Sequence, residues 1–266
     1  MPVYTTNHAP SVLRTHSWRT ASNSAAYLLP HLTPSMRILD IGCGPGSITV
    51  DLATHVPSGH VTGIEYVPDP LPAAEALAAS RGVKNVDFRV GDIHALEFED
   101  ESFDVVHVHQ VLQHVADPVK ALREMKRVVK SGGGIVAVRE SASMTWYPEN
   151  RGISDWLDLT GRMAKGKGGN PHPGRYIHVW AREAGFEMRN IKRSAGTWCF
   201  SSPEERDYWG ESMAGRMESS GFAEGAVKEG FASPEELEGV ARGWREWVGE
   251  EDGWFAVLHG EILCWK

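Results

Sequence analysis

The chain has 266 residues, of which 41% are hydrophobic and 23% charged, values typical of a globular protein with one large domain or two small ones. Its net charge of −8 argues against nucleic acid as the main partner, because a phosphate backbone favours basic surfaces. No run of roughly 18 apolar residues predicts a membrane span, and the opening segment lacks the features of a secretory signal. The three cysteines are widely spaced, so we expect a cytoplasmic protein with no disulfide framework and no metal site.

Strand-like and helix-like segments alternate from residue 17 to about residue 200, which is typical of a mostly parallel sheet covered by helices. Several of the strand-like segments are nearly continuous apolar runs, as in strands buried on both faces. Ile48, Leu52 and Val56 fall four residues apart and predict a helix after the first strand. The expected strands are 37–42, 60–66, 86–91, 103–109 and 134–140.

A second helix is predicted between the fourth and fifth strands. Leu122, Met125 and Val129 lie on one face of it. It begins after Asp117, which is followed by proline, and ends before Gly132, and both are common boundary signals. Its lysines and arginines are interpreted as a solvated face.

Beyond residue 140 the pattern changes, and helical segments predominate before an alternating segment closes the chain. Breaks in the longest helical segment are expected at Gly221 and Gly230. We therefore expect one domain, 1–266, with a helical insertion before its last strand. The segments are a short helix with a glycine-rich loop (154–174), a helix (175–185), a strand (186–198), helices (203–250) and a last strand (253–266).

Tryptophan is distributed unevenly. Of ten tryptophans only Trp18 precedes residue 140, and the other nine lie between Trp146 and Trp265. Two interpretations stay open: a tryptophan-rich core, or a wide apolar pocket contributed by the later half of the chain.

A glycine-rich turn follows the first strand. Gly42, Gly44 and Gly46 have the spacing G-x-G-x-G and open onto a helix, so bare backbone and free N–H groups can approach a ligand. The dinucleotide fingerprint is G-x-G-x-x-G, which is one residue longer. Asp40, two residues before the first glycine, is also unusual for a dinucleotide site.

Two acids follow this turn at informative positions. Glu65 lies 23 residues beyond Gly42, close to the spacing of roughly 20 residues at which an acid binds a ribose hydroxyl pair. Asp92 comes just after the third strand and could accept a hydrogen bond from the exocyclic amine of adenine. Each acid alone could be a solvated residue at a strand end, but together with the turn they predict an adenosine ligand.

The segments "LDIGCGPG", "GIEY", "GDI" and "FDVVHVHQVLQHVADPVKALREMKRVVKSGG", in this order, resemble class I S-adenosylmethionine-dependent methyltransferases, most closely the ubiquinone/menaquinone-biosynthesis type. The resemblance covers roughly residues 17–140. It implies an α/β fold: a Rossmann-like seven-stranded, mostly parallel sheet with an antiparallel last strand and a helical lid insertion. It also implies S-adenosyl-L-methionine as the cofactor and S-adenosyl-L-homocysteine as the product.

The same resemblance assigns residues to the parts of the cofactor. Asp40 and the three glycines would hold the methionine part, and Glu65 the ribose. His109 and Gln110, at the end of the fourth strand, would face the methionine part and the sulfonium. The cofactor-binding residues expected on this basis are Asp40, Gly42, Gly44, Gly46, Glu65, Tyr66, Asp92, Ile93, His109 and Gln110, with Asp92 and Ile93 at the adenine.

The segment "HSWRTASNSAAYLLPHL" resembles a fungal subgroup of these enzymes. Arg19 in it could pair with the cofactor carboxylate, since a guanidinium matches a carboxylate bidentately, or it could be a surface arginine. Tyr4 and Trp18 are expected to fold over the cofactor as part of an N-terminal lid, 1–35.

Methyl transfer from a sulfonium is an in-line displacement, so the protein mainly aligns the acceptor and excludes water. His114 is the candidate general base, and the alternative is a histidine that caps or packs at a helix start. His107, which alternates with valines on the fourth strand, is expected to be packed.

The acceptor is expected to be an apolar small molecule held by the later half of the chain. Open α/β sheets bind ligands in loops after their strands, and the residues from 140 onwards follow the fifth strand. The organisation expected is a cofactor core (36–140), acceptor-side loops with the sixth strand (141–200), a lid (201–252) and the last strand (253–266). The acceptor-binding candidates are Glu140, Met144, Trp146, Tyr147, Tyr208 and Trp209.

Within the fungal subgroup the resemblance extends to gliotoxin bis-thiomethyltransferases, which S-methylate both thiols of a reduced dithiol. C- or O-methylation of a quinol or phenol is the alternative. An NAD-dependent oxidoreductase would need the longer glycine spacing, and a non-catalytic adenosine-binding module would need no acceptor cavity. The sequence leaves the oligomeric state open.

Overall fold

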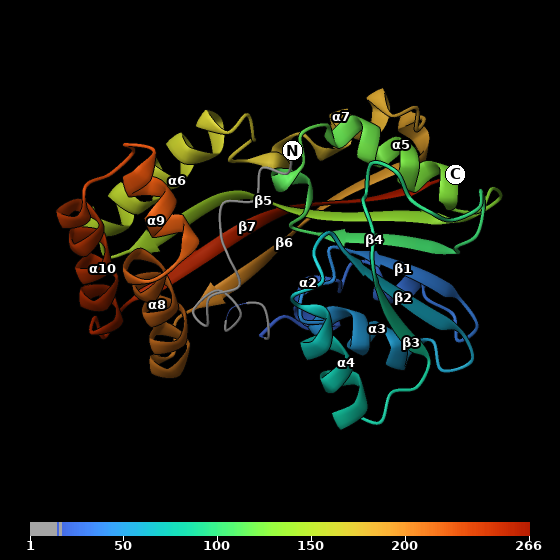
Figure 1. Ribbon diagram of the computed structural model, residues 1–266, viewed down its shortest axis with the longest axis horizontal. Helices are drawn as coiled ribbons and strands as arrows, with labels where there is room; N and C mark the ends of the chain where they lie inside the picture. Colours follow the sequence, from blue (N-terminus) through green and yellow to red (C-terminus); the bar gives the residue numbers. More distant parts are fainter. Residues whose placement is uncertain (1–14, 16–17) are drawn as a thin grey trace. The chain divides into compact units, whose positions relative to one another are not determined.

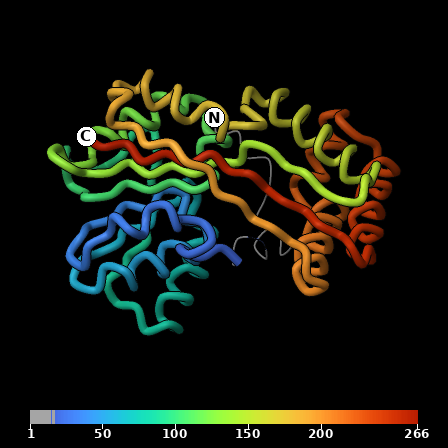
Figure 2. The backbone as a smooth tube through the Cα atoms, turned by 180° about the vertical axis from the view of Figure 1, so that it is seen from behind, coloured from blue at the N-terminus to red at the C-terminus, as the bar shows by residue number. Residues whose placement is uncertain are grey.

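The computed structural model describes Thr15 and residues 18–266, so the expected contribution of Tyr4 to a lid lies outside the described residues. Seven strands form one sheet in the order β3-β2-β1-β4-β5-β7-β6 (Figures 1 and 2). Strands β1 to β5 pair in parallel and the final strand is antiparallel, which confirms the fold expected from the sequence. The bounds are β1 (Arg37–Ile41), β2 (His60–Glu65), β3 (Val86–Val90), β4 (Val105–His109), β5 (Ile135–Tyr147), β6 (Ile191–Phe200) and β7 (Trp254–Trp265).

Several helices begin at capping residues. Asp117 accepts a hydrogen bond from the N–H of Lys120 at the start of α5, and Ser202 and Ser233 form capping boxes at α8 and α10. No described helix is long and apolar enough to cross a membrane. The α-helices are α2 (Ala21–Ser24), α3 (Ser47–His55), α4 (Leu71–Ser80), α5 (Pro118–Val128), α6 (Arg151–Gly166), α7 (Ile177–Glu183), α8 (Pro203–Glu218), α9 (Gly221–Lys228) and α10 (Pro234–Val248); the 3₁₀ turns are η1 (Leu29–His31), η2 (Leu112–His114), η3 (Pro173–Arg175) and η4 (Met188–Asn190).

The described chain divides into two compact units, and β5, β6 and β7 contribute residues to both. The first, called here the glycine-loop unit, comprises 18–142, His172–Gly196 and His259–Lys266. The second, called the aromatic unit, comprises Ser143–Pro171 and Thr197–Leu258. Helices α8, α9 and α10 lie within the range expected for a helical insertion, and α6 belongs to the same unit.

The core of the glycine-loop unit has two layers, one on each face of the sheet (Figure 1). Val106 and Val108 of β4 face the layer formed by α5 and α7, whereas Val105 faces the layer formed by α2 and α3. Side chains alternate between faces along a strand, so a strand such as β4, which is buried at every position, needs cover on both sides.

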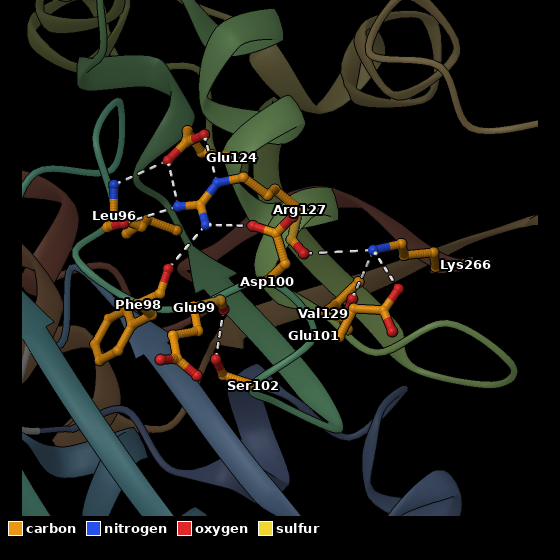
Figure 3. Close-up of polar contacts among 10 residues, drawn as sticks. All are labelled: Leu96, Phe98, Glu99, Asp100, Glu101, Ser102, Glu124, Arg127, Val129 and Lys266. Atoms are coloured by element: carbon orange, nitrogen blue, oxygen red, sulfur yellow. Dashed lines mark hydrogen bonds and ion pairs between the residues drawn. The ribbon is translucent and has the colours of Figure 1, made fainter.

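Arg127 of α5 fastens this helix to the loop between β3 and β4 (Figure 3). Its guanidinium donates to the carbonyl oxygens of Leu96 and Phe98, each at 2.8 Å, and pairs with Asp100 at 2.9 Å and Glu124 at 2.8 Å. Arg127, whose side chain is 31% exposed, therefore also has a structural role beyond the solvated face expected for this helix.

Indole rings form the core of the aromatic unit. Trp244 and Trp247 of α10 are fully buried and both pack on Phe255 of β7. Trp156 of α6 packs edge-on against Trp244, with ring centroids 5.2 Å apart. Of the two interpretations of the tryptophan distribution, the tryptophan-rich core therefore applies to these rings.

Strand β5 is longer than the sequence predicts. Residues 141–147 are expected to form an acceptor-side loop, but β5 continues through them to Tyr147, so Glu140, Met144 and Trp146 lie on a strand and do not follow one. The run of threonine and aromatic residues favours extended backbone, and Pro148 ends it.

Candidate functional site

The glycine turn between β1 and α3 consists of left-handed backbone. Gly42, Gly44 and Gly46 have φ values of 70°, 52° and 78°. A Cβ on Gly42 would lie 2.4 Å from a methyl carbon of Val111, and one on Gly46 would lie 2.7 Å from the Cβ of Ala74. Conformation and packing thus both exclude a side chain at Gly42 and Gly46, and the turn presents bare backbone at its glycines.

Asp40 is buried beneath this turn, with 3% of its surface exposed. One carboxylate oxygen lies 2.7 Å from Nδ1 of His107, its register partner on β4, and the other accepts a hydrogen bond from the hydroxyl of Thr49 at 2.6 Å. Since Thr49 lies in α3, this carboxylate ties β1, β4 and α3 together. His107 is fully buried, as expected for a packed histidine.

Glu65 ends β2 beside the same turn. Its carboxylate accepts hydrogen bonds from the backbone N–H of Gly44 at 3.0 Å and of Tyr66 at 2.8 Å. The ring of Tyr66 is half-exposed. The structure therefore brings the ribose candidate, the glycine turn and an aromatic ring together.

The adenine candidates lie in the loop after β3. Asp92 accepts a hydrogen bond from the backbone N–H of His94 at 2.8 Å, and its side chain is 44% exposed. The side chain of Ile93 is buried in the core, so only the backbone of this residue is suited to contact a ligand in this arrangement.

The end of β4 is strained and polar. Gln110 has a φ of 55°, a left-handed conformation that non-glycine residues adopt rarely and mainly at functional sites. Its Oε1 accepts a hydrogen bond from Arg19 at 3.0 Å. His109 is buried, and burial together with the charges of Arg19 and Arg139 holds its pKa well below the usual value. The imidazole of His109 is therefore neutral at physiological pH.

His114 and Glu140 meet at η2, which follows β4. Oε1 of Glu140 accepts hydrogen bonds from the backbone N–H groups of Val111 at 2.8 Å and Leu112 at 2.6 Å, and Oε2 has no hydrogen-bond partner in the described chain. Burial raises the pKa of Glu140 to about 8, and it lowers the pKa of His114 to about 4, with a further contribution from the charge of Arg19. Glu140 thus holds the turn that carries His114.

Sequence reasoning missed a buried polar group contributed by β5 and β7. Arg139, 2% exposed, pairs with Glu261 at 3.2 Å and donates to the carbonyl oxygen of Asn23 at 2.7 Å. Its Nη2 lies 3.1 Å from Nδ1 of His259, whose Nε2 lies 3.0 Å from the amide nitrogen of Gln110. These residues are up to 149 positions apart in sequence, so no local pattern could have revealed the group.

The remaining acceptor-binding candidates belong to the aromatic unit. Trp209 is 7% exposed and its ring stacks on Phe200, with centroids 4.3 Å apart, so it is a core residue of this unit. Tyr147 is 59% exposed, and its carbonyl oxygen accepts a hydrogen bond from Trp247 at 3.1 Å. Met144, Trp146 and Tyr208 are partly buried.

These residues suit S-adenosylmethionine. The left-handed glycines leave three positions of the turn without a Cβ, and the carboxylate of Glu65 stands at the carboxyl end of the neighbouring strand, where a ribose acid is needed. In Thr15 and residues 18–266, no three His, Cys, Asp or Glu side chains could hold a metal ion.

A family model described as a methyltransferase domain matches residues 32–184. An uncharacterised methyltransferase of Schizosaccharomyces pombe is 37% identical over 96% of this chain and 93% of its own length. A probable methyltransferase of Aspergillus luteorubrus is 28% identical over 99% of this chain and 97% of its own. A demethylmenaquinone methyltransferase of Roseiflexus castenholzii is 33% identical over 67% of this chain and 73% of its own.

Solved structures share the fold. A putative sarcosine dimethylglycine methyltransferase from Galdieria sulphuraria superimposes with a TM-score of 0.53 at 20% identity, over 95% of this chain and 85% of its own. A phosphoethanolamine N-methyltransferase of Haemonchus contortus, solved with S-adenosylhomocysteine, has a TM-score of 0.54 at 19% identity, over 88% of this chain and 49% of its own.

The fold and the site together define an enzyme that transfers a methyl group from S-adenosyl-L-methionine. The chain belongs to the methyltransferase-domain family. The oxidoreductase alternative is not favoured, in agreement with the short glycine spacing.

Proposed function

We propose that this methyltransferase acts on an apolar small molecule through a thiol, and that a reduced dithiol secondary metabolite such as reduced gliotoxin represents the acceptor class. The observation on which this choice depends is the environment of His114, the candidate base. Its pKa of about 4 makes it neutral at physiological pH but only weakly basic. A thiol, which ordinarily has a pKa of about 8.5, needs less help from a base than a phenol at about 10.

The cofactor roles that we propose follow from the contacts already described. Glu65, which already contacts the glycine turn, would accept from the ribose hydroxyls, and Arg19 would pair with the carboxylate of the methionine part. Asp40 is only 3% exposed and both of its oxygens have protein partners, so we assign it the positioning of the glycine turn. When bound, S-adenosylmethionine supplies an activated methyl group on its sulfonium.

The acceptor step then needs only alignment and removal of one proton. In this proposal the sulfur of the acceptor would attack the methyl carbon in line, S-adenosyl-L-homocysteine would be the leaving group, and the thiol proton would pass to His114 or to water. Glu140 holds the η2 backbone, which fixes the place of His114 relative to β4 and β5. A dithiol would undergo two successive displacements, each using one cofactor molecule.

Mass spectrometry after incubation with S-adenosylmethionine tests the acceptor class. Reduced gliotoxin should gain one or two methyl groups, and a quinol or phenol of similar size should gain fewer. Because a thiol needs little help from a base, His114→Ala should lower kcat for the thiol by less than roughly tenfold, and His55→Ala, at an exposed site in α3, should not lower it. Methylation of the quinol or phenol alone would overturn the proposal.

A quinol or phenol methyltransferase is the second candidate. The likeness to a demethylmenaquinone methyltransferase over 67% of this chain supports it. Under this alternative the weakly basic His114 would be insufficient by itself, so activity on the quinol should survive His114→Ala unchanged.

A further inference from the structure

Four side chains form a chain of contacts within the glycine-loop unit. Arg19 donates to Oε1 of Gln110 at 3.0 Å. The amide nitrogen of Gln110 lies 3.0 Å from Nε2 of His259, and Nδ1 of His259 lies 3.1 Å from Nη2 of Arg139. The four residues come from the N-terminal segment, the end of β4, β7 and β5.

The three contacts cannot all be hydrogen bonds at once. A guanidinium only donates, and a neutral imidazole has one donor and one acceptor nitrogen. With its oxygen turned to Arg19, Gln110 presents N–H groups to His259, which requires Nε2 to accept and Nδ1 to carry the proton. Arg139, however, also presents N–H groups, and these require Nδ1 to accept. The two contacts of His259 thus demand opposite tautomers.

Rotation of the Gln110 carboxamide removes this conflict. Its oxygen would then accept from Nε2–H of His259, whose Nδ1 would accept from Arg139. In this orientation the amide N–H groups of Gln110 would face Arg19, which is unfavourable unless an anion lies between them. A ligand carboxylate supplies such an anion, since it accepts from both groups.

We propose that His259 is a positioning residue for the cofactor, which changes from the Nδ1–H to the Nε2–H tautomer when the carboxylate of the cofactor engages Arg19. The inference rests on the proposed role of Arg19. In the bound state the amide of Gln110 donates to the carboxylate, and the hydrogen bonds from Arg139 through His259 to Gln110 are all satisfied.

The surroundings restrict the change to the carboxamide and one proton. His259 is 0% exposed, and Arg139 is held by Glu261 and by the carbonyl oxygen of Asn23. The backbone of Gln110 is fixed in its left-handed conformation, with its N–H donating to the carbonyl oxygen of Arg139 at 2.9 Å. These contacts keep Arg139 and the backbone of Gln110 in place, so the direction of the hydrogen bonds between them can reverse without movement of the fold.

Nuclear magnetic resonance of the ring nitrogens measures this change directly in the whole protein labelled with ¹⁵N-histidine. On addition of S-adenosylhomocysteine, one histidine should change from Nδ1–H to Nε2–H, and its signal should be missing in His259→Asn. A purely structural role for His259 would leave its tautomer the same with and without ligand, and that result would overturn the inference.

Gln110→Glu is the matched variant, because it keeps the shape of the side chain and presents two acceptors. The carboxylate can accept from Arg19 and from His259 together, so His259 should stay Nε2–H in both states. Since the new carboxylate competes for Arg19, the Kd of S-adenosylhomocysteine should rise by about tenfold. The signal that responds to ligand in the wild type but not in this variant also identifies His259 independently of His259→Asn.

Calorimetry separates the tautomer change from the proposed cofactor site. Binding of S-adenosylhomocysteine with an unchanged tautomer at His259 would overturn only the inference. Absence of binding would overturn the proposed cofactor site together with the inference.

Discussion

The two compact units bury different chemistry. The glycine-loop unit buries charged or titratable side chains at its strands, including Asp40, Arg139 and Glu140, each at most 3% exposed. The aromatic unit instead buries rings, among them Trp244 and Phe255, both fully covered. A buried charge is tolerated only with hydrogen bonds or a partner, whereas a buried ring requires shape complementarity.

We propose, in line with the proposed function, that the two units have different tasks. Polar groups in fixed positions suit a charged, zwitterionic cofactor, whose identity is set by hydrogen bonds. Apolar packing suits a unit whose aromatic side chains would shape the surface that contacts the acceptor. Four substitutions test this division, two in each unit.

Glu140→Gln should have one of the two largest effects on stability, and its effect should depend on pH. Because burial raises the pKa of Glu140 from 4.5 to about 8, the folded state binds more protons than the unfolded state between these values. This contribution to stability is complete below about pH 4.5 and is lost as the pH rises through about 8. Denaturant unfolding measures this difference. Between about pH 4.5 and pH 8, the free energy of unfolding of the wild type should fall by roughly 3–5 kcal/mol relative to that of the variant.

Glu238→Gln, at an exposed position of α10, is the control and should leave the pH profile unchanged. If the free energy of unfolding depended on pH in the same way in wild type and Glu140→Gln, folding would not raise the pKa of Glu140. The surroundings of Glu140 would then stabilise the charged carboxylate.

Trp209→Ala should destabilise the protein by about 3–5 kcal/mol, because it removes a buried ring stacked on Phe200. Trp254→Ala, whose ring is 39% exposed, should cost markedly less. Calorimetry on folded protein should give the same Kd for S-adenosylhomocysteine in Trp209→Ala and wild type. A tenfold weaker Kd would contradict the division between the units.

Gly42→Ala should cost about 2–4 kcal/mol, the sum of a left-handed alanine and a clash with Val111. Gly82 has a similar φ of 67° but nothing within 4 Å of a new Cβ, so Gly82→Ala should cost only about 1 kcal/mol. Thermal unfolding measures both. Only Gly42→Ala should also weaken binding of S-adenosylhomocysteine, and equal binding by the two variants would remove the glycine turn from the proposed site.

Tyr147→Ala should have the smallest effect on stability, within about 0.5 kcal/mol, because the side chain is 59% exposed and the carbonyl bonded to Trp247 remains. If Tyr147 contacts the acceptor, steady-state kinetics should show a higher KM for the acceptor and an unchanged KM for S-adenosylmethionine. Unchanged kinetics for both would remove Tyr147 from the acceptor site.

Local patterns in the sequence were sufficient for most of the fold. Apolar runs predict all seven strands, and proline and glycine punctuation predicts α5 and the break at Gly230, which has a φ of 74°. The end of β5 was misplaced, although the segment up to Tyr147 has no glycine or proline that would break a strand, because its continuation depends on pairing within the sheet.

The sequence by itself determined the class of ligand, because the glycine turn, Asp40 and Glu65 occur at short, regular spacings set by one strand–turn–helix–strand unit. Only the tertiary structure decided how the polar groups are connected. Glu140 bonds to η2, and His259 bridges Gln110 and Arg139, because the sheet order places β5 between β4 and β7. Hydrogen bonds across neighbouring strands depend on sheet order, which sequence separation does not encode.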